Sequence, residues 1–128
     1  MAASTELHES PESLSTETIN FHRAIVSLQE ELEAVDWYRQ RAQACDDPEL
    51  RDILLHNMRE EMEHAAMVLE WMRRHDADLD QRLRTYLFTT GRVTEIEEEE
   101  EEQDGPGDAQ NEAPSAPRMT VGTMKGES

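Results

Sequence analysis

The chain has 128 residues, of which 33% are charged, and its formal net charge at neutral pH is −18. This length and composition predict one modest helical unit rather than two domains. The acidity argues against nucleic acid as a partner, because such binding rests on Lys and Arg meeting phosphates. It suits hard cations, which prefer oxygen ligands. We expect no secretory signal and no membrane span, because no apolar run has the required length or position. The single Cys45 fits a reducing compartment.

The first part of the chain predicts a flexible leader and then a long helix. Residues 1–14 are polar, rich in serine and interrupted by Pro11. From about Ser15 to Ala44 apolar residues recur at helical spacing, and Ser15 is a suitable N-cap. The apolar positions are Ile25, Leu28, Leu32, Val35, Tyr38 and Ala42.

A second long helix is predicted from about Pro48 to Arg74, after a break at residues 45–47. Proline is favoured at the first helical position, and the preceding aspartate can cap the helix. A shorter helix is predicted from about Leu79 to Phe88. The expected fold class is therefore all-α, with an antiparallel two-helix hairpin and a short C-terminal helix within residues 15–90. A lone hairpin buries its apolar stripes poorly, so we expect it to dimerise into a four-helix bundle.

The remaining residues predict a tail. Residues 91–117 contain Glu95 and the run from Glu97 to Glu102, whose charges repel one another. We therefore expect an acidic, disordered linker there. Residues 118–128 regain apolar side chains.

One motif stands out on the second predicted helix, where Glu61 and His64 form a Glu-x-x-His. Glu31 lies fifteen positions before Asp46, the centre of the predicted turn, and Glu61 lies fifteen positions after it. In an antiparallel hairpin these two glutamates stand level, about 22 Å from the turn. Both interrupt the apolar stripes of their helices, with His64 at the edge.

These three residues predict a metal site. A carboxylate buried alone costs several kcal/mol or becomes protonated, and a metal ion removes that penalty. Ferritin-type bundles build di-iron sites from a Glu on two helices and a Glu-x-x-His on the other two. One chain supplies half of this set, so two copies are needed. Carboxylates with few imidazoles suit iron or manganese.

Several neighbouring residues admit a structural or a functional interpretation. Glu30, Glu33 and Trp37 fall on one line of the first helix, either as a solvated face or as an acidic lane beside the site. Tyr38 is either ordinary core or a hydrogen-bonding neighbour of the metal ligands. The other histidines fit surface roles better; they are His8, His22, His56 and His75.

With these residues in place, the chain resembles the encapsulated ferritins, which are cargo proteins of bacterial encapsulin shells. The matching segments are HRAIVSLQEELEAVDWY, HNMREEMEHAAMVLEWMRR and RLRTYLF. The resemblance implies that Glu31, Glu61 and His64 are iron ligands of a di-iron ferroxidase centre shared by two subunits. It places Tyr38 beside that centre, and it makes Glu30, Glu33 and Trp37 a region through which metal enters.

The resemblance also carries expectations about assembly and location. It implies an open ring of ten subunits that oxidises iron, with mineral deposited in the lumen of an encapsulin shell in the bacterial cytoplasm. The C-terminal segment is similar to the peptide that docks such cargo on the shell wall, with methionine at both anchors where leucine is usual. Its residues are Met119, Thr120, Val121, Gly122, Thr123, Met124, Lys125 and Gly126.

The function expected from the sequence is therefore the oxidation of Fe²⁺ by oxygen. Two alternatives stay open at this point. The same ligands could hold iron or another divalent ion without turnover, or the chain could be an acidic helical adaptor that occupies a shell.

Overall fold

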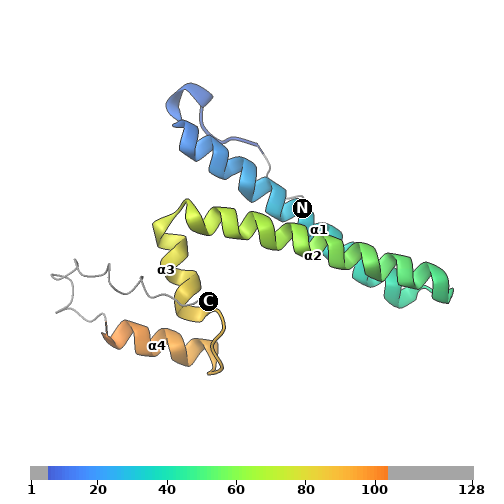
Figure 1. Ribbon diagram of the computed structural model, residues 1–128. Coiled ribbons are helices and arrows are strands. Elements are labelled where there is room, and N and C mark those ends of the chain that lie inside the picture. The colour runs from blue at the N-terminus through green and yellow to red at the C-terminus, as the bar shows by residue number, and fades with distance from the viewer. Residues whose placement is uncertain (1–5, 104–128) are drawn as a thin grey trace. The chain divides into compact units, whose positions relative to one another are not determined.

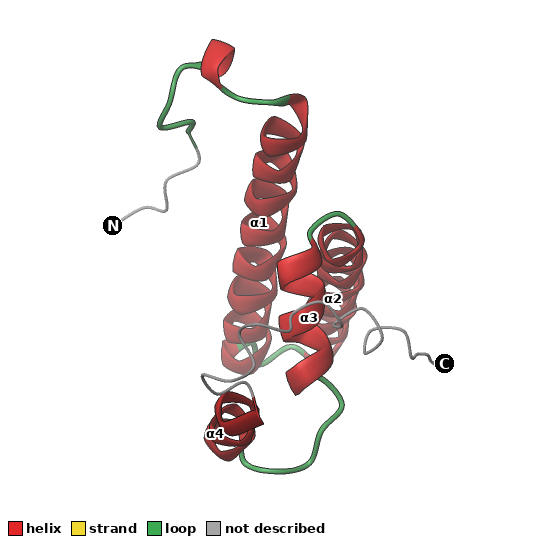
Figure 2. Ribbon diagram, turned by 90° about the vertical axis from the view of Figure 1, so that its left-hand side faces the viewer, coloured by secondary structure: helices red, strands yellow, loops and turns green. Residues whose placement is uncertain are grey.

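A computed structural model describes residues 6–103 of the chain, and every regular element in that range is helical (Figure 2). In chain order the elements are a short 3₁₀ helix at Pro11–Ser13, then α1 (Thr16–Ala44), α2 (Pro48–Arg74), α3 (Ala77–Tyr86) and α4 (Val93–Gln103). The predicted all-α class is confirmed. None of the described helices is long and apolar enough to cross a membrane.

The first long helix begins where its capping residue predicts. The Ser15 hydroxyl accepts a hydrogen bond from the Thr18 backbone N–H at 3.1 Å, which satisfies a donor that the first helical turn leaves free. The helix ends at Ala44, and the next residue, Cys45, adopts an extended conformation. The described residues of the predicted leader contain one regular element, the 3₁₀ turn at Pro11–Ser13.

The turn between α1 and α2 is held by side chains. The Asp47 carboxylate caps α2 by accepting from the backbone N–H groups of Glu49 and Leu50, at 2.9 and 3.3 Å. Pro48 occupies the first turn, where it lacks only an N–H that would have no helical partner. The side chain of Arg51 reaches back to the carbonyl of Cys45. These contacts join two long helices through only three residues.

The two helices form an antiparallel hairpin and lie side by side near the turn (Figure 1). They diverge toward the opposite end, which carries the start of α1 and the end of α2 (Figure 1). Four apolar residues are buried in the described part of the chain: Ala42, Met58, Ala65 and Met72. This core is thin, because many larger apolar side chains of both helices remain partly exposed.

A second compact unit begins at Ala77, and its described residues, 77–103, contain α3 and α4. α3 begins and ends two residues before the predicted bounds. Its last turn is extended by a hydrogen bond from the Leu87 N–H to the Leu83 carbonyl at 2.8 Å. Phe88 follows with a φ of 64° and a fully exposed side chain. A left-handed residue commonly ends a helix, although glycine is the usual choice.

The predicted disorder of residues 91–117 is wrong for its acidic core, because Val93–Gln103 is the helix α4. Glutamate is a good helix former, and each like-charge pair one turn apart costs only a few tenths of a kcal/mol. The Arg92 carbonyl accepts from the N–H groups of Glu95 and Ile96, both at 3.0 Å, so the helix has a defined start. Glu95 also favours the positive end of the helix dipole. The rest of the predicted linker and the whole predicted targeting segment lie outside the described residues.

Candidate metal centre

Glu31, Glu61 and His64 come together on the hairpin. One ligand atom from each residue lies within 4.8 Å of the other two. The Nδ1 atom of His64 is 3.3 Å from Glu61 Oε1 and 3.5 Å from Glu31 Oε1. In the described part of the chain this is the one group of three or more acidic, histidine or cysteine side chains with such spacing.

The cluster follows from the register of the hairpin. Glu31 projects from α1, while Glu61 and His64 lie three residues apart on α2 and therefore on neighbouring positions of one helix face. Because the helices are antiparallel and joined by a short turn, positions at equal distance from the turn meet. Both carboxylate side chains are 26% exposed and the imidazole is 47% exposed. The cluster is thus accessible from one side of the hairpin.

The charges of the cluster are interdependent. A hydrogen bond with Glu61 raises the pKa of Glu31 above its usual range, with desolvation as the next cause. The same contact lowers the pKa of Glu61, so the pair holds its proton mainly on Glu31. The hydrogen bond to Glu61 also raises the pKa of His64, with both carboxylates adding electrostatic attraction. A positive charge at the position of the imidazolium proton is therefore favourable.

The donor set suits a divalent transition metal. Bonds of about 2.1 Å to carboxylate oxygen and imidazole nitrogen place opposite donors about 4.2 Å apart. Donor atoms within 4.8 Å of one another reach a common ion after a small side-chain movement. Two carboxylates and one imidazole fit iron, manganese or zinc better than copper or calcium. Three protein ligands leave coordination positions open for a further ligand or a second chain.

The remaining predicted site residues lie outside this cluster. Tyr38 is half-buried on α1, and its ring contacts the guanidinium of Arg41, 5.4 Å from the ring centre. Glu30, Glu33 and Trp37 are exposed on the same helix. Their predicted roles as a neighbour of the centre and as a path for incoming metal stay predictions.

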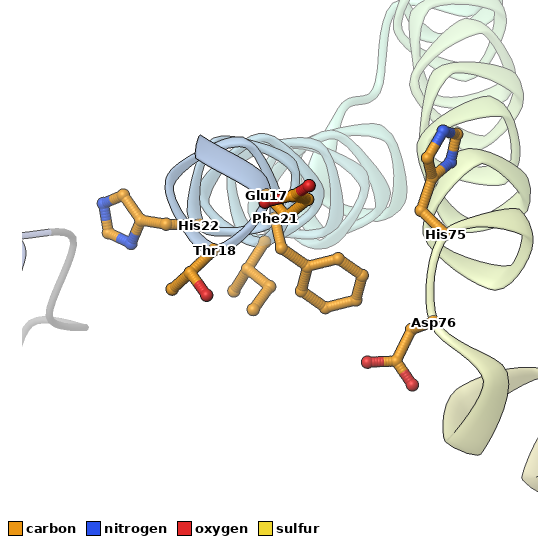
Figure 3. A pocket seen from close by; sticks show the side chains of 7 residues that line it. Glu17, Thr18, Phe21, His22, His75 and Asp76 are labelled. Carbon is orange, nitrogen blue, oxygen red and sulfur yellow. The ribbon is translucent and has the colours of Figure 1, made fainter. Parts of the chain in front are cut away.

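Two histidines lie near a separate hollow of about 330 Å³ at the open end of the hairpin. Figure 3 shows His22 pointing away from His75, so their rings do not converge on one ion. His75 is stacked on Trp71 with ring centres 4.0 Å apart, and its Nδ1 lies 2.8 Å from the Trp71 carbonyl. The hollow is lined by Glu17, Thr18, Phe21, His22, Ile25, His75 and Asp76. This hollow is the space left where α1 and α2 diverge.

Sequence reasoning missed one residue that matters for the hairpin. Arg51 lies in the first turn of α2, where its side chain contacts the carbonyl that precedes the turn. A lone arginine on a charged helix gives no periodic signal. The one clue to this contact is the short turn that ends just before the helix of Arg51 begins.

Fold and site together define a class of protein, an acidic helical hairpin with a cluster of two carboxylates and one imidazole on one face. A family model described as EncFtn-like matches residues 6–90. The chain belongs to this family, which confirms the resemblance drawn from its segments.

Three similar proteins match this chain over most of its length. An encapsulated ferritin-like protein of Rhodospirillum rubrum is 52% identical over 128 residues, covering 98% of this chain and 91% of the relative. A ferritin-like protein of Thermotoga maritima is 53% identical over 94 residues, covering 73% of this chain and 82% of the relative. A crystal structure of a protein from Nitrosomonas europaea is 56% identical with a TM-score of 0.66, covering 68% of this chain and 96% of that one.

Proposed function

We propose that this protein is a ferroxidase that oxidises Fe²⁺ with oxygen at a di-iron site formed by two copies of the chain. The observation that carries the proposal is the convergence of Glu31, Glu61 and His64 in a member of the EncFtn-like family. Iron is the substrate of this reaction, and the protein supplies the ligands that bind it.

Charge balance supports a pair of ions. Two chains bring four carboxylates and two imidazoles to a shared site. With neutral imidazoles the ligands carry four negative charges, which two ferrous ions neutralise. Bridging carboxylates hold ions about 3.5–4 Å apart in other two-metal sites. The paired site therefore favours two ferrous ions without any further charged group.

Exposure supports the pairing of two chains. The cluster is partly exposed on a single hairpin, and so are large apolar residues of the same two helices, Ile25, Leu32, Ile53 and Met62 among them. A helical layer with one apolar side needs a partner to cover it. A second hairpin covers such a surface and brings the missing ligands. A ring of ten subunits remains the assembly implied by the resemblance.

The residues have separate tasks in the reaction. The carboxylates of Glu31 and Glu61 bind the ions and tolerate their change in charge, while His64 provides a neutral nitrogen ligand once its proton has left. Two ferrous ions give one electron each to O₂, which takes up two protons from solvent and leaves as hydrogen peroxide, and the ferric product leaves for mineral formation. The redox chemistry is that of the metal, and the chain contributes position and electrostatics.

The relative from Rhodospirillum rubrum is described as encapsulated. We extend this to the present chain: the protein is cargo of an encapsulin shell in the bacterial cytoplasm, and residues 119–126 are its targeting peptide. Alternating apolar anchors around Gly122 suit an extended peptide in a surface groove.

Three substitutions test the ferroxidase assignment. Glu31→Ala, Glu61→Ala and His64→Ala each remove one ligand, so aerobic Fe²⁺ oxidation should slow to near the rate of buffer. Glu63→Ala is the matched control, since Glu63 is an exposed glutamate between the two α2 ligands. Equal oxidation by all four variants and the parent excludes the site. Oxygen consumption per Fe²⁺ added separates an oxidase from a protein that only stores the ion.

A further inference from the structure

We propose that Arg51 is a positioning residue for the metal centre. By clamping the end of α1 to the start of α2, it fixes the axial register at which Glu31 faces Glu61. This inference rests on the proposed metal site, and it assigns a role to a residue about 15 Å from that site, as ten residues of helix at 1.5 Å each imply.

The clamp consists of two hydrogen bonds to one atom. The Arg51 Nε donates to the Cys45 carbonyl oxygen at 3.1 Å, and Nη2 donates to the same oxygen. Carbonyls at a helix C-terminus lack helical partners and attract cations. The Arg51 backbone N–H donates to the Asp47 carbonyl at 2.9 Å, so the residue is itself anchored in the first turn of α2. The arginine therefore links the first turn of α2 to Cys45, the residue that caps α1.

Packing alone defines the register weakly. The buried core in the described residues consists of two alanines and two methionines, and no side chain there is less than 2% exposed. Methionine is flexible and fills irregular gaps, so methionine-rich contacts specify one arrangement poorly. Alanine offers little shape for interlocking. The three-residue turn limits sliding of the helices, and with so thin a core a contact that holds this turn in one conformation makes the register more exact.

An axial shift of one helix at the turn displaces the metal-binding residues by the same amount. A helix is stiff along its axis, so a shift at the turn moves every later residue equally. One residue of slip displaces α2 by about 1.5 Å, whereas metal–ligand distances tolerate about 0.2 Å. A fraction of one residue is therefore enough to separate Glu31 from the α2 ligands.

The first test compares metal binding by variants of the full chain, with Co²⁺ as the probe because its visible absorption reports coordination geometry. Arg51→Met keeps the aliphatic stem and removes both donors, and we expect Co²⁺ to bind about tenfold more weakly with altered absorption bands. Arg51→Lys retains one donor and should restore part of the affinity. Arg59→Met is the control, since Arg59 is exposed on the same helix and its loss changes the net charge equally.

Helical content and unfolding separate positioning from general stability. If Arg51→Met binds Co²⁺ with the affinity and spectrum of the parent, the proposal is overturned. It is also overturned if affinity falls only in proportion to lost helicity in both Arg51 variants. A parent that binds no Co²⁺ or Fe²⁺ contradicts the proposed function instead.

The second test measures the register without metal. Spin labels at Gln29 and Glu63, both exposed and each seventeen positions from Asp46, are introduced in a Cys45→Ser background. The Arg51→Met substitution should shift or broaden the distance between labels, and Arg59→Met should leave it unchanged. Identical distance distributions in all variants refute the clamp, whatever the metal data show.

Discussion

Metal affinity of this protein should depend steeply on pH below the pKa of His64. The imidazole has two carboxylate oxygens at 3.3 and 3.5 Å, and its hydrogen bond to Glu61 raises its pKa above the ordinary value of 6.5. These contacts therefore favour the protonated form of the His64 imidazole in the metal-free protein. An ion that binds Nδ1 must displace this proton.

The magnitude follows from one imidazole per chain and one ion per chain. Each displaced proton makes the apparent binding constant rise about tenfold per pH unit, which is about 1.4 kcal/mol. Below the raised pKa of His64 the affinity for Co²⁺ should rise by up to that factor per pH unit, and the slope should flatten above that pKa. The proton on Glu31 adds to the slope at lower pH, because its pKa is raised from a carboxylate value.

Calorimetric titration with Co²⁺ in two buffers of different ionisation enthalpy measures the affinity and the protons released per ion. His64→Ala should bind more weakly and lose most of the slope. His56→Ala is the control, because His56 lies on the same helix with a side chain that is 67% exposed. An affinity independent of pH in the parent, or an unchanged slope in His64→Ala, refutes the reasoning.

Three further outcomes are expected. Phe88→Gly should stabilise the end of α3 by about 1 kcal/mol, because a left-handed φ is costly for any residue with a Cβ and the fully exposed ring of Phe88 makes no contact to lose. Slower amide exchange around residue 88 is the expected result, and faster exchange contradicts it. Asp47→Ala removes the cap of α2, at about 1 kcal/mol, and should lower the melting temperature by about 4–8 °C, with Asp46→Ala as the control. Truncation after Gln103 should leave Fe²⁺ oxidation intact and abolish co-purification with the shell protein; loading of the truncated chain would show that residues 104–128 do not target it.

The hairpin could be predicted because its signals are local and agree with one another. Ser15 and Asp47 are caps and Pro48 starts a helix, so their positions alone set the first residues of both long helices to within one residue. Once both helices are placed, counting from Asp46 brings Glu31 level with Glu61, and the structure shows their side chains in one cluster with His64. The geometry of the site was thus implicit in the length of the turn.

Two features could not be obtained in this way. The helix α4 depends on a balance in which the helix propensity of glutamate exceeds its charge repulsion, and patterning rules weigh only the repulsion. The contact of Arg51 depends on where a long, flexible side chain points, which sequence spacing does not determine. Both features were missed because they depend on competing interaction energies of similar size. Neither kind of interaction leaves a repeating pattern in the sequence.

A site divided between two chains links metal binding to assembly. Bringing two hairpins together without metal places four carboxylates near one another, and the raised pKa of Glu31 shows that even two already disfavour full ionisation. Ions neutralise the charge that pairing concentrates, so they bind the paired state more tightly than the single chain. By linkage the same free energy that strengthens metal binding on pairing also strengthens pairing on metal binding. Under the proposed function, a ferroxidase built from half-sites would therefore be assembled by its own substrate, with Glu31, Glu61 and His64 as contact residues as well as ligands.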